Sequence, residues 1–162
     1  MKHTLAMVGF GGMAGWHYDL IERIDNLTVA GIWDTKAERR EYALSRQIHV
    51  YESLEDLLAD KSVDLVLVAT PNDFHKSIAI QAMESGKNVV SEKPVTLSSR
   101  ELREMIEASE RTGRFLTVHQ NRRWDEDFLT VKKVMEEGKL GDIFRLESRV
   151  HGSRGIPGRG RY

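Results

Sequence analysis

Three consecutive residues, Glu92, Lys93 and Pro94, could do chemistry because they follow a short apolar segment that ends at Ser91. We expect residues 88–91 to form a strand, and ligands of open parallel sheets bind beyond the carboxyl ends of the strands. The proline fixes its own φ and restricts Lys93 to extended backbone, so the ammonium group would point in one direction. The triplet predicts a catalytic pair, Lys93 and Glu92, although a loop salt bridge before a turn explains the same residues.

A second candidate site has the spacing GxGxxA and lies between an expected strand and an expected helix. The first glycine permits a tight turn, the second lets the backbone approach a pyrophosphate, and the small Ala14 lets the helix pack close to the strand. The amides and the dipole at the helix start would complement the phosphate charge. A tight turn without a ligand is the alternative. The predicted dinucleotide-binding residues of this segment are Gly9, Phe10, Gly11, Gly12, Met13 and Ala14.

Asp34 follows Ala14 by twenty residues and ends the second expected strand. Its carboxylate could accept hydrogen bonds from both hydroxyls of an adenosine ribose and would repel a 2′-phosphate, so the sequence favours NAD as the cofactor. A role as the N-cap of the next helix is the alternative for this aspartate. Lys36, Arg39 and Arg40 follow closely enough to leave NADP open, although we expect them to form a solvated helix face.

Short apolar segments alternate with amphipathic ones along the chain, which predicts an α/β fold with a doubly wound parallel sheet of the Rossmann type. The amphipathic stripe Met13, Trp16, Leu20 and Ile24 predicts the buried face of the first helix. Ser98 with Glu101 forms a capping box for a helix that ends near Gly113. The expected strands are residues 5–8, 29–33, 50–51, 65–69, 88–91 and 115–118.

In the strand order 3-2-1-4-5-6, the ligand crevice opens between the carboxyl ends of the first and fourth strands. The fourth strand is followed by Thr70, Pro71, Asn72 and His75, which would therefore face the same ligand as Glu92. Considered alone, Asn72 could cap the next helix, and His75 could be an ordinary first-turn histidine.

The pattern changes after Val118. A helix is expected over residues 128–137, and residues 143–150 alternate between apolar and charged side chains, which is typical of an antiparallel strand with one buried face. We therefore divide the chain into a NAD(P)-binding Rossmann domain over residues 1–120 and a second α/β domain that has only begun. Residues 121–162 would supply the crossover helix and first strand of that C-terminal substrate domain.

Composition excludes several classes of function. The 162 residues carry a net charge of −1, which argues against nucleic acid or a membrane as a partner, and they include no cysteine. The absence of cysteine fits a reducing compartment, and we expect a cytoplasmic protein. None of the six histidines has a spacing such as His-Glu-x-x-His, so the sequence predicts no metal site.

The motifs together resemble the glucose–fructose oxidoreductase and inositol dehydrogenase family (Gfo/Idh/MocA). The similarity is carried by the glycine segment, Asp34, the Thr70-Pro71-Asn72-x-x-His75 pattern and Glu92-Lys93-Pro94, and residues 121–124 and 138–143 resemble the crossover into the family's second domain. The resemblance implies NAD(P)-dependent hydride transfer to or from a sugar, cyclitol or related polyol. It also implies that Lys93 matches the family's catalytic-site lysine.

By the same resemblance, Pro71, Asn72 and His75 would form the nicotinamide-side wall, and the bond between Lys93 and Pro94 would be cis. As an ammonium, Lys93 could stabilise developing alkoxide charge, with Glu92 as a positioning partner rather than a base. The family's proton acceptor is a histidine of the second domain that has no counterpart before Tyr162, so we expect nucleotide binding but very little turnover from these 162 residues.

His119 ends the sixth expected strand and could touch the cofactor, although we expect a packed histidine at the edge of the core. Two other classes of function compete with an enzyme, namely a dinucleotide-sensing module and a non-catalytic interaction module. A short-chain dehydrogenase is disfavoured because the chain has no Tyr-x-x-x-Lys pair. We expect a small sugar or polyol as the substrate and a homo-oligomer as the assembly.

Overall fold

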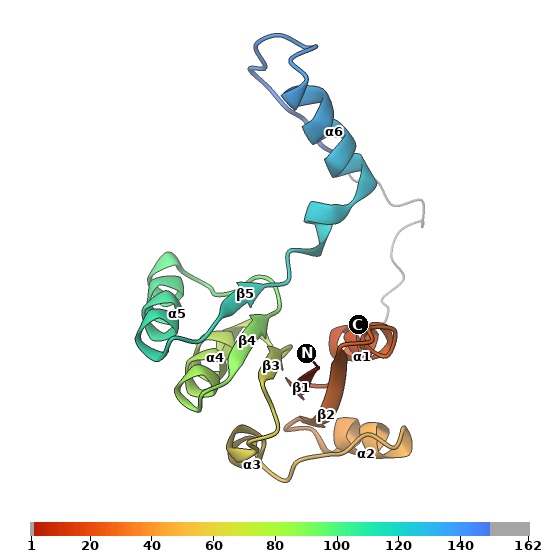
Figure 1. The fold of residues 1–162 in the computed structure, drawn as a ribbon, viewed down its shortest axis with the longest axis vertical. Helices are drawn as coiled ribbons and strands as arrows, with labels where there is room; N and C mark the ends of the chain where they lie inside the picture. The colour runs from red at the N-terminus through yellow and green to blue at the C-terminus, as the bar shows by residue number, and fades with distance from the viewer. Residues whose placement is uncertain (1, 150–162) are drawn as a thin grey trace. The chain divides into compact units, whose positions relative to one another are not determined.

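A computed structural model describes residues 2–149 of the chain. Five parallel strands form one sheet in the order β2-β1-β3-β4-β5 (Figure 1). This is the predicted Rossmann-type α/β fold. The strands are β1 (His3–Val8), β2 (Leu27–Trp33), β3 (Leu65–Val68), β4 (Asn88–Ser91) and β5 (Leu116–Val118).

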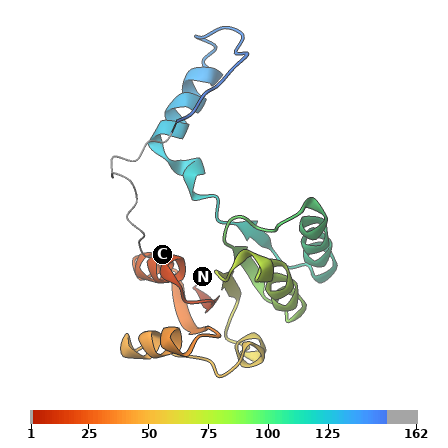
Figure 2. The same cartoon turned by 180° about the vertical axis from the view of Figure 1, so that it is seen from behind.

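Helices connect the strands and cover both faces of the sheet. Two of them, α1 and α2, pack on one face, and α3, α4 and α5 pack on the other, as Figure 1 and the reverse view in Figure 2 show. The bounds are α1 (Gly12–Ile21), α2 (Ala37–Ser45), α3 (Leu54–Ala59), the short 3-10 helix η1 (Asn72–Phe74), α4 (His75–Glu84) and α5 (Ser99–Thr112).

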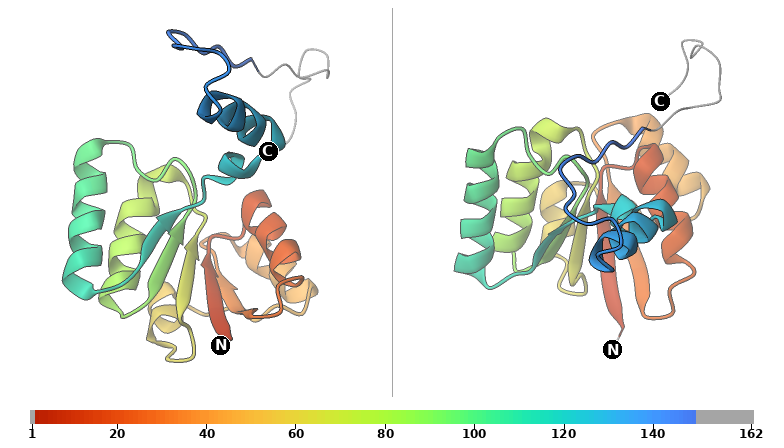
Figure 3. Two further views of the ribbon diagram at one scale, coloured as in Figure 1. Left: turned by 45° about the horizontal axis from the view of Figure 1, so that its top comes forward. Right: turned by 90° about the horizontal axis from the view of Figure 1, so that it is seen from above.

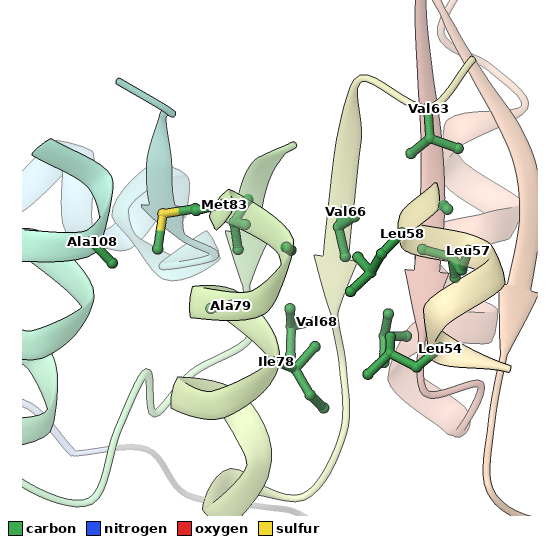
Figure 4. Packing of buried hydrophobic residues seen from close by; sticks show 14 of the residues in the cluster. Leu54, Leu57, Leu58, Val63, Val66, Val68, Ile78, Ala79, Met83 and Ala108 are labelled. Atoms are coloured by element: carbon green, nitrogen blue, oxygen red, sulfur yellow. The ribbon is translucent and has the colours of Figure 1, made fainter. Parts of the chain in front are cut away.

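Side chains alternate between the two faces along each strand, which explains why helices pack on both faces of the sheet. In β1, Ala6 and Val8 belong to the core beneath α3, α4 and α5, whereas Leu5 and Met7 belong to the core beneath α1 and α2. All four side chains are almost fully buried, as expected for a strand covered on both faces. Figure 4 shows the first core close up, with apolar side chains of α3, α4 and the strands pointing toward one another.

The third expected strand is wrong in extent. Residues 50–51 contribute only one parallel bridge, between Val50 and Ile32, so the sheet has five strands although the predicted order is kept. The chain crosses close to β2 at Gly31, where a β-carbon would lie 2.7 Å from the carbonyl oxygen of His49. It then turns into α3, which Ser53 caps, and this turn ends the pairing after one bridge.

The predicted buried face of the first helix is also wrong. Met13 and Trp16 are exposed, and α1 instead buries Ala14, His17 and Ile21. These three residues recur at three- and four-residue steps, so the helix is rotated by one position relative to the predicted stripe. The rotation follows from the glycine segment, because Ala14 must face the sheet for α1 to pack against it.

The chain divides into two compact units, the second of which begins at Gln120. The second unit contains η2 (Asn121–Trp124) and α6 (Glu126–Glu136). The helix α6 confirms the predicted helix over residues 128–137, although it begins two residues earlier and ends one residue earlier. The predicted strand over residues 143–150 is wrong over its described part, because residues 143–149 form none and Phe144 is 98% exposed. A strand needs a partner, and residues 120–149 supply none. Residues 150–162 lie outside the described part.

No helix among the described residues is both long enough and apolar enough to span a bilayer.

Candidate functional site

The candidate site lies where the parallel strands end. Because all five strands run in one direction, the segments that follow them gather at one edge of the sheet, which Figure 3 shows from two sides. These segments begin with Gly9 after β1, Asp34 after β2, Thr70 beyond β3, Glu92 after β4 and His119 after β5. The topology therefore brings the sequence-predicted residues to the same edge.

The glycine segment has the local geometry that its sequence predicts. Gly9 has φ +88°, and a β-carbon there would lie 2.7 Å from the carbonyl oxygen of Ala69, so the turn passes directly against the end of β3. Gly11 precedes the first turn of α1, and the fully buried Ala14 lets that helix sit against the sheet. Gly12 and Met13 are exposed at the start of α1, where backbone amides are available to an anion.

Asp34 fastens this loop to the end of β2. Its side chain is almost fully buried, and Oδ2 accepts a hydrogen bond of 2.7 Å from the N–H of Phe10, which is also buried. Oδ1 accepts a second bond of 2.8 Å from the N–H of Lys36. The alternative of an N-cap is wrong, because Lys36 occupies the N-cap position of α2 and no side chain caps it.

Two of the neighbouring cations are not the solvated helix face that the sequence predicts. Arg39 donates to Asp34 Oδ2 at 3.2 Å and lies beside Gly11. Arg40 donates to the carbonyl oxygens of Asp34 and Thr35. Both guanidinium groups therefore turn back toward the end of β2, where the Asp34 side chain and two main-chain carbonyl oxygens accept their hydrogen bonds.

A pocket of about 410 Å³ opens beside these groups. Its lining includes Gly9, Asp34, Arg39, Thr70 and Pro71. Such a volume lies in the range of small-molecule sites. Thr70 also lines the pocket, and its Oγ1 is the one buried side-chain polar atom within residues 2–149 that has no hydrogen-bond partner.

The segment after β3 has an exposed part and a buried part. Pro71 and Asn72 are exposed, and the predicted alternative that Asn72 caps a helix is wrong because its side chain makes no capping bond. His75 is buried instead, with Nε2 2.9 Å from the carbonyl oxygen of Thr70 and Nδ1 3.0 Å from that of Pro94. This histidine joins the loop after β3 to the loop after β4.

Glu92 is buried in a cluster of histidines. Its Oε1 accepts hydrogen bonds from His17 Nε2 at 2.6 Å and from His119 Nδ1 at 3.0 Å, and Oε2 accepts one from the N–H of Lys93 at 3.1 Å. The bond between Lys93 and Pro94 is cis, as the family resemblance implies. The Lys93 side chain is exposed. No salt bridge within the described residues joins Glu92 to the Lys93 ammonium, so the predicted alternative of a loop salt bridge is wrong.

These contacts decide the charge of Glu92. Burial raises the pKa of its carboxyl, but the hydrogen bonds from His17 and from the N–H of Lys93, together with the charge of His119, outweigh burial and lower the pKa below its ordinary value. The carboxylate is therefore ionised near neutral pH. A low pKa and three occupied acceptor positions suit a positioning group better than a general base.

Sequence reasoning did not assign His17 to any site, and it did not predict that His119 contacts Glu92. The two histidines lie on α1 and after β5, and no spacing along the chain connects them to Glu92. The sequence could have indicated this cluster only through the place of each histidine near the carboxyl end of a strand. His17 lies on α1, which follows β1, and His119 directly follows β5. The prediction of a packed histidine at the core edge describes the burial of His119 but not its bond to Glu92.

Comparison with known proteins identifies the family. Residues 3–120 match the family model GFO_IDH_MocA, described as an oxidoreductase family with a NAD-binding Rossmann fold. The scyllo-inositol 2-dehydrogenase (NADP(+)) IolW of Bacillus subtilis is 34% identical over 143 residues, which cover 86% of this chain and 39% of that protein.

Two solved structures are also similar. A NAD-binding protein from Listeria innocua is 51% identical with a TM-score of 0.90, and the match covers 98% of this chain and 47% of that one. The WlbA dehydrogenase from Bordetella pertussis, solved in complex with NADH and UDP-GlcNAcA, is 29% identical with a TM-score of 0.81 and a coverage of 87% and 44%.

The chain spans less than half of the length of each of these relatives. The matched segment contains the glycine loop, Asp34, the wall after β3 and the Glu92-Lys93-Pro94 triplet. Motifs, fold and family match agree, and the chain belongs to the Gfo/Idh/MocA oxidoreductase family, whose NAD-binding Rossmann domain it carries.

Proposed function

We propose that the whole protein is an NAD(P)-dependent dehydrogenase that transfers hydride between a nicotinamide and a sugar, cyclitol or related polyol. The observation that carries this proposal is that the dinucleotide pocket and Lys93 lie at the same edge of one sheet. Hydride chemistry is supplied by the cofactor, whereas the protein binds, orients and stabilises charge.

The cofactor would lie across the strand ends in a definite direction. Its pyrophosphate would lie against the first turn of α1, where no side chain caps the amides of Gly12 and Met13 and the helix dipole favours an anion. Its adenosine ribose fits beside Asp34, which still has acceptor capacity because a carboxylate offers about four acceptor positions and three are used. The nicotinamide half would then lie toward Thr70, Pro71 and Asn72.

Lys93 would contact the reacting oxygen of the substrate. An ammonium beside a carbinol can donate a hydrogen bond and stabilise the alkoxide charge that develops as hydride leaves the carbon. Glu92, held ionised and almost fully buried, fixes the backbone from which Lys93 projects. His75 serves the same end from the other side, because it bridges Thr70 and Pro94.

Asp34 and Arg39 would decide between NAD and NADP. Asp34 repels a 2′-phosphate, so we propose NAD as the preferred cofactor, but Arg39 is close enough to Asp34 to offer a cation to such a phosphate. The name of the related Bacillus subtilis enzyme specifies NADP(+), which supports keeping both cofactors in the test.

The test is a titration of the purified chain with NADH and, separately, with NADPH, followed by quenching of tryptophan fluorescence. Trp33 lines the pocket beside Asp34 and supplies the signal. We expect saturable binding with NADH preferred. Asp34→Ser should weaken NADH binding by about tenfold or more, which corresponds to the loss of one charged hydrogen bond, and should weaken NADPH binding less.

A matched control is Asp25→Ser, which removes an exposed carboxylate from the turn that precedes β2, at the opposite edge of the sheet. This variant should bind both dinucleotides like the parent chain. Absence of binding by the parent chain would refute the dinucleotide site. Equal weakening of NADH and NADPH by Asp34→Ser would refute the assigned role of Asp34 in cofactor choice.

A further inference from the structure

We propose that His17, Glu92 and His119 form a binding site for one divalent transition-metal ion of the zinc class. The three side chains come from different elements, namely α1, the loop after β4 and the segment after β5, and all three belong to the first compact unit. One potential ligand atom of each lies within 4.8 Å of the other two. This proposal concerns metal binding alone and does not depend on which substrate the protein uses.

The donor set selects the class of metal. Two imidazole nitrogens and one carboxylate oxygen suit Zn²⁺, Co²⁺ or Ni²⁺, whereas Mg²⁺ and Ca²⁺ prefer ligand sets made of oxygen. A set of three protein ligands leaves at least one coordination position open. Because Glu92 immediately precedes Lys93, a water molecule or a substrate hydroxyl at that position would lie in the neighbourhood of the proposed catalytic lysine.

The distances require only a small adjustment. Ligands about 2.1 Å from a metal ion lie roughly 3.0–3.4 Å from one another in octahedral or tetrahedral geometry. Glu92 Oε1 is 2.6 Å from His17 Nε2 and 3.0 Å from His119 Nδ1. Each histidine nitrogen would therefore move away from Glu92 Oε1 by less than about 1 Å to admit the ion.

The surroundings hold the ligands in place. The rings of His17 and His119 meet edge to face with their centroids 4.4 Å apart, and the indole of Trp16 packs against both. Glu92 Oε2 is oriented by the N–H of Lys93. His17 and Glu92 are buried, while the side chain of His119 is 25% exposed and provides a path for the ion to enter.

Binding would exchange hydrogen bonds for coordinate bonds without a change of oxidation state. A neutral imidazole that donates its N–H to Glu92 carries its lone pair on the other nitrogen, so each ring must change tautomer to present that pair to the metal. The ring proton then lies on His17 Nδ1 and on His119 Nε2. The ion takes over from the two N–H groups as the partner of Glu92 Oε1.

Substitution by glutamine separates a metal site from a purely hydrogen-bonded cluster. A glutamine amide can still donate a hydrogen bond to Glu92, but it is a poor ligand for a transition metal. The informative variants are therefore His17→Gln and His119→Gln. The matched control is His3→Gln, because the side chain of His3 is half exposed at the start of β1, away from the cluster.

The experiment titrates the metal-stripped chain with Co²⁺ and records the visible absorption of the bound ion, with Zn²⁺ as the competitor. We expect one bound ion per chain, displacement by Zn²⁺, and binding weaker by roughly tenfold or more in both cluster variants but unchanged in His3→Gln. Melting temperatures verify that each variant folds. If His17→Gln does not fold, His119→Gln, at the more exposed position, tests the metal site by itself.

Two results would overturn the proposal. The first is a parent chain that gives no cobalt absorption band at millimolar Co²⁺. The second is cobalt binding that both cluster variants retain at full strength, which would place the ion elsewhere on the protein. In either case the three residues would be a hydrogen-bonded support for the loop after β4 and nothing more.

Discussion

Replacement of Gly9 by alanine tests whether the loop geometry of the pocket is as tight as the structure shows. The backbone of Gly9 has φ +88°, a conformation that costs an L-residue roughly 1–2 kcal/mol. The new β-carbon would also lie 2.7 Å from the carbonyl oxygen of Ala69, and relieving such an overlap within packed backbone costs about 1–3 kcal/mol. The free energy of unfolding should therefore fall by about 2–5 kcal/mol, and the melting temperature by about 4–20 °C.

Thermal unfolding monitored by circular dichroism measures this effect, with Gly12→Ala as the control. A β-carbon at Gly12 would have no atom within 4 Å, and its φ is not positive. Gly12→Ala should therefore leave the melting temperature unchanged or raise it slightly, because alanine loses less backbone entropy on folding. Equal melting temperatures for Gly9→Ala and the parent chain would refute the close approach of this loop to β3.

Three further changes test the site and its support. Lys93→Met, made in a full-length active protein that contains this domain, should lower kcat far more than it weakens NADH binding, and equal losses in steady-state kinetics and cofactor titration would contradict the catalytic assignment. Tyr51→Phe should lower stability at pH 7 by about 1 kcal/mol, because the hydrogen bond from the Tyr51 hydroxyl is the largest of the contacts, with those from Ser62, that together lower the pKa of the Asp60 carboxyl from 3.8 to about 2, and because solvent screens this partly exposed carboxylate. Because the pKa of Asp60 is lower in the folded state than in the unfolded state, this carboxylate stabilises the fold only above the unfolded-state pKa. The difference in free energy of unfolding between the variant and the parent, measured by urea titration, should therefore shrink as the pH falls from about 4 to 2. Ser98→Ala should cost about 1 kcal/mol in the same assay because its hydroxyl caps α5, whereas Ser99→Ala should cost little, and similar losses from both would argue against the cap.

The sequence was most informative where local chemistry and the fold impose the same requirement. The apolar segments predicted five strands to within two residues at each end, because a parallel sheet covered on both faces demands continuous apolar residues. The capping box at Ser98 and the left-handed Gly113 set the ends of α5 as predicted. The error in the buried face of α1 arose because hydrophobicity and the glycine motif favoured different faces, and the requirement to bury Ala14 prevailed.

Contacts made across the sheet could not be predicted from one sequence. Arg39 was assigned to solvent because a charge on a helix is usually solvated, yet the buried Asp34 next to it draws it inward. His17 and His119 lie about a hundred residues apart along the chain and meet only because β1, β4 and β5 end at one edge of the sheet. Spacing along the chain carries no information about such a meeting.

The environment of Glu92 explains why the Lys93 ammonium has no carboxylate partner among residues 2–149. An adjacent glutamate would ordinarily pair with a lysine ammonium and neutralise it, which is the basis of the salt-bridge alternative. Here His17, His119 and the N–H of Lys93 use three acceptor positions of the carboxylate, and within residues 2–149 no carboxylate forms an ion pair with the ammonium. The ammonium is thus left at the strand edge for a ligand. On this reasoning the triplet is not a self-contained motif, since its chemistry depends on two histidines supplied by the first helix and the last strand of the domain.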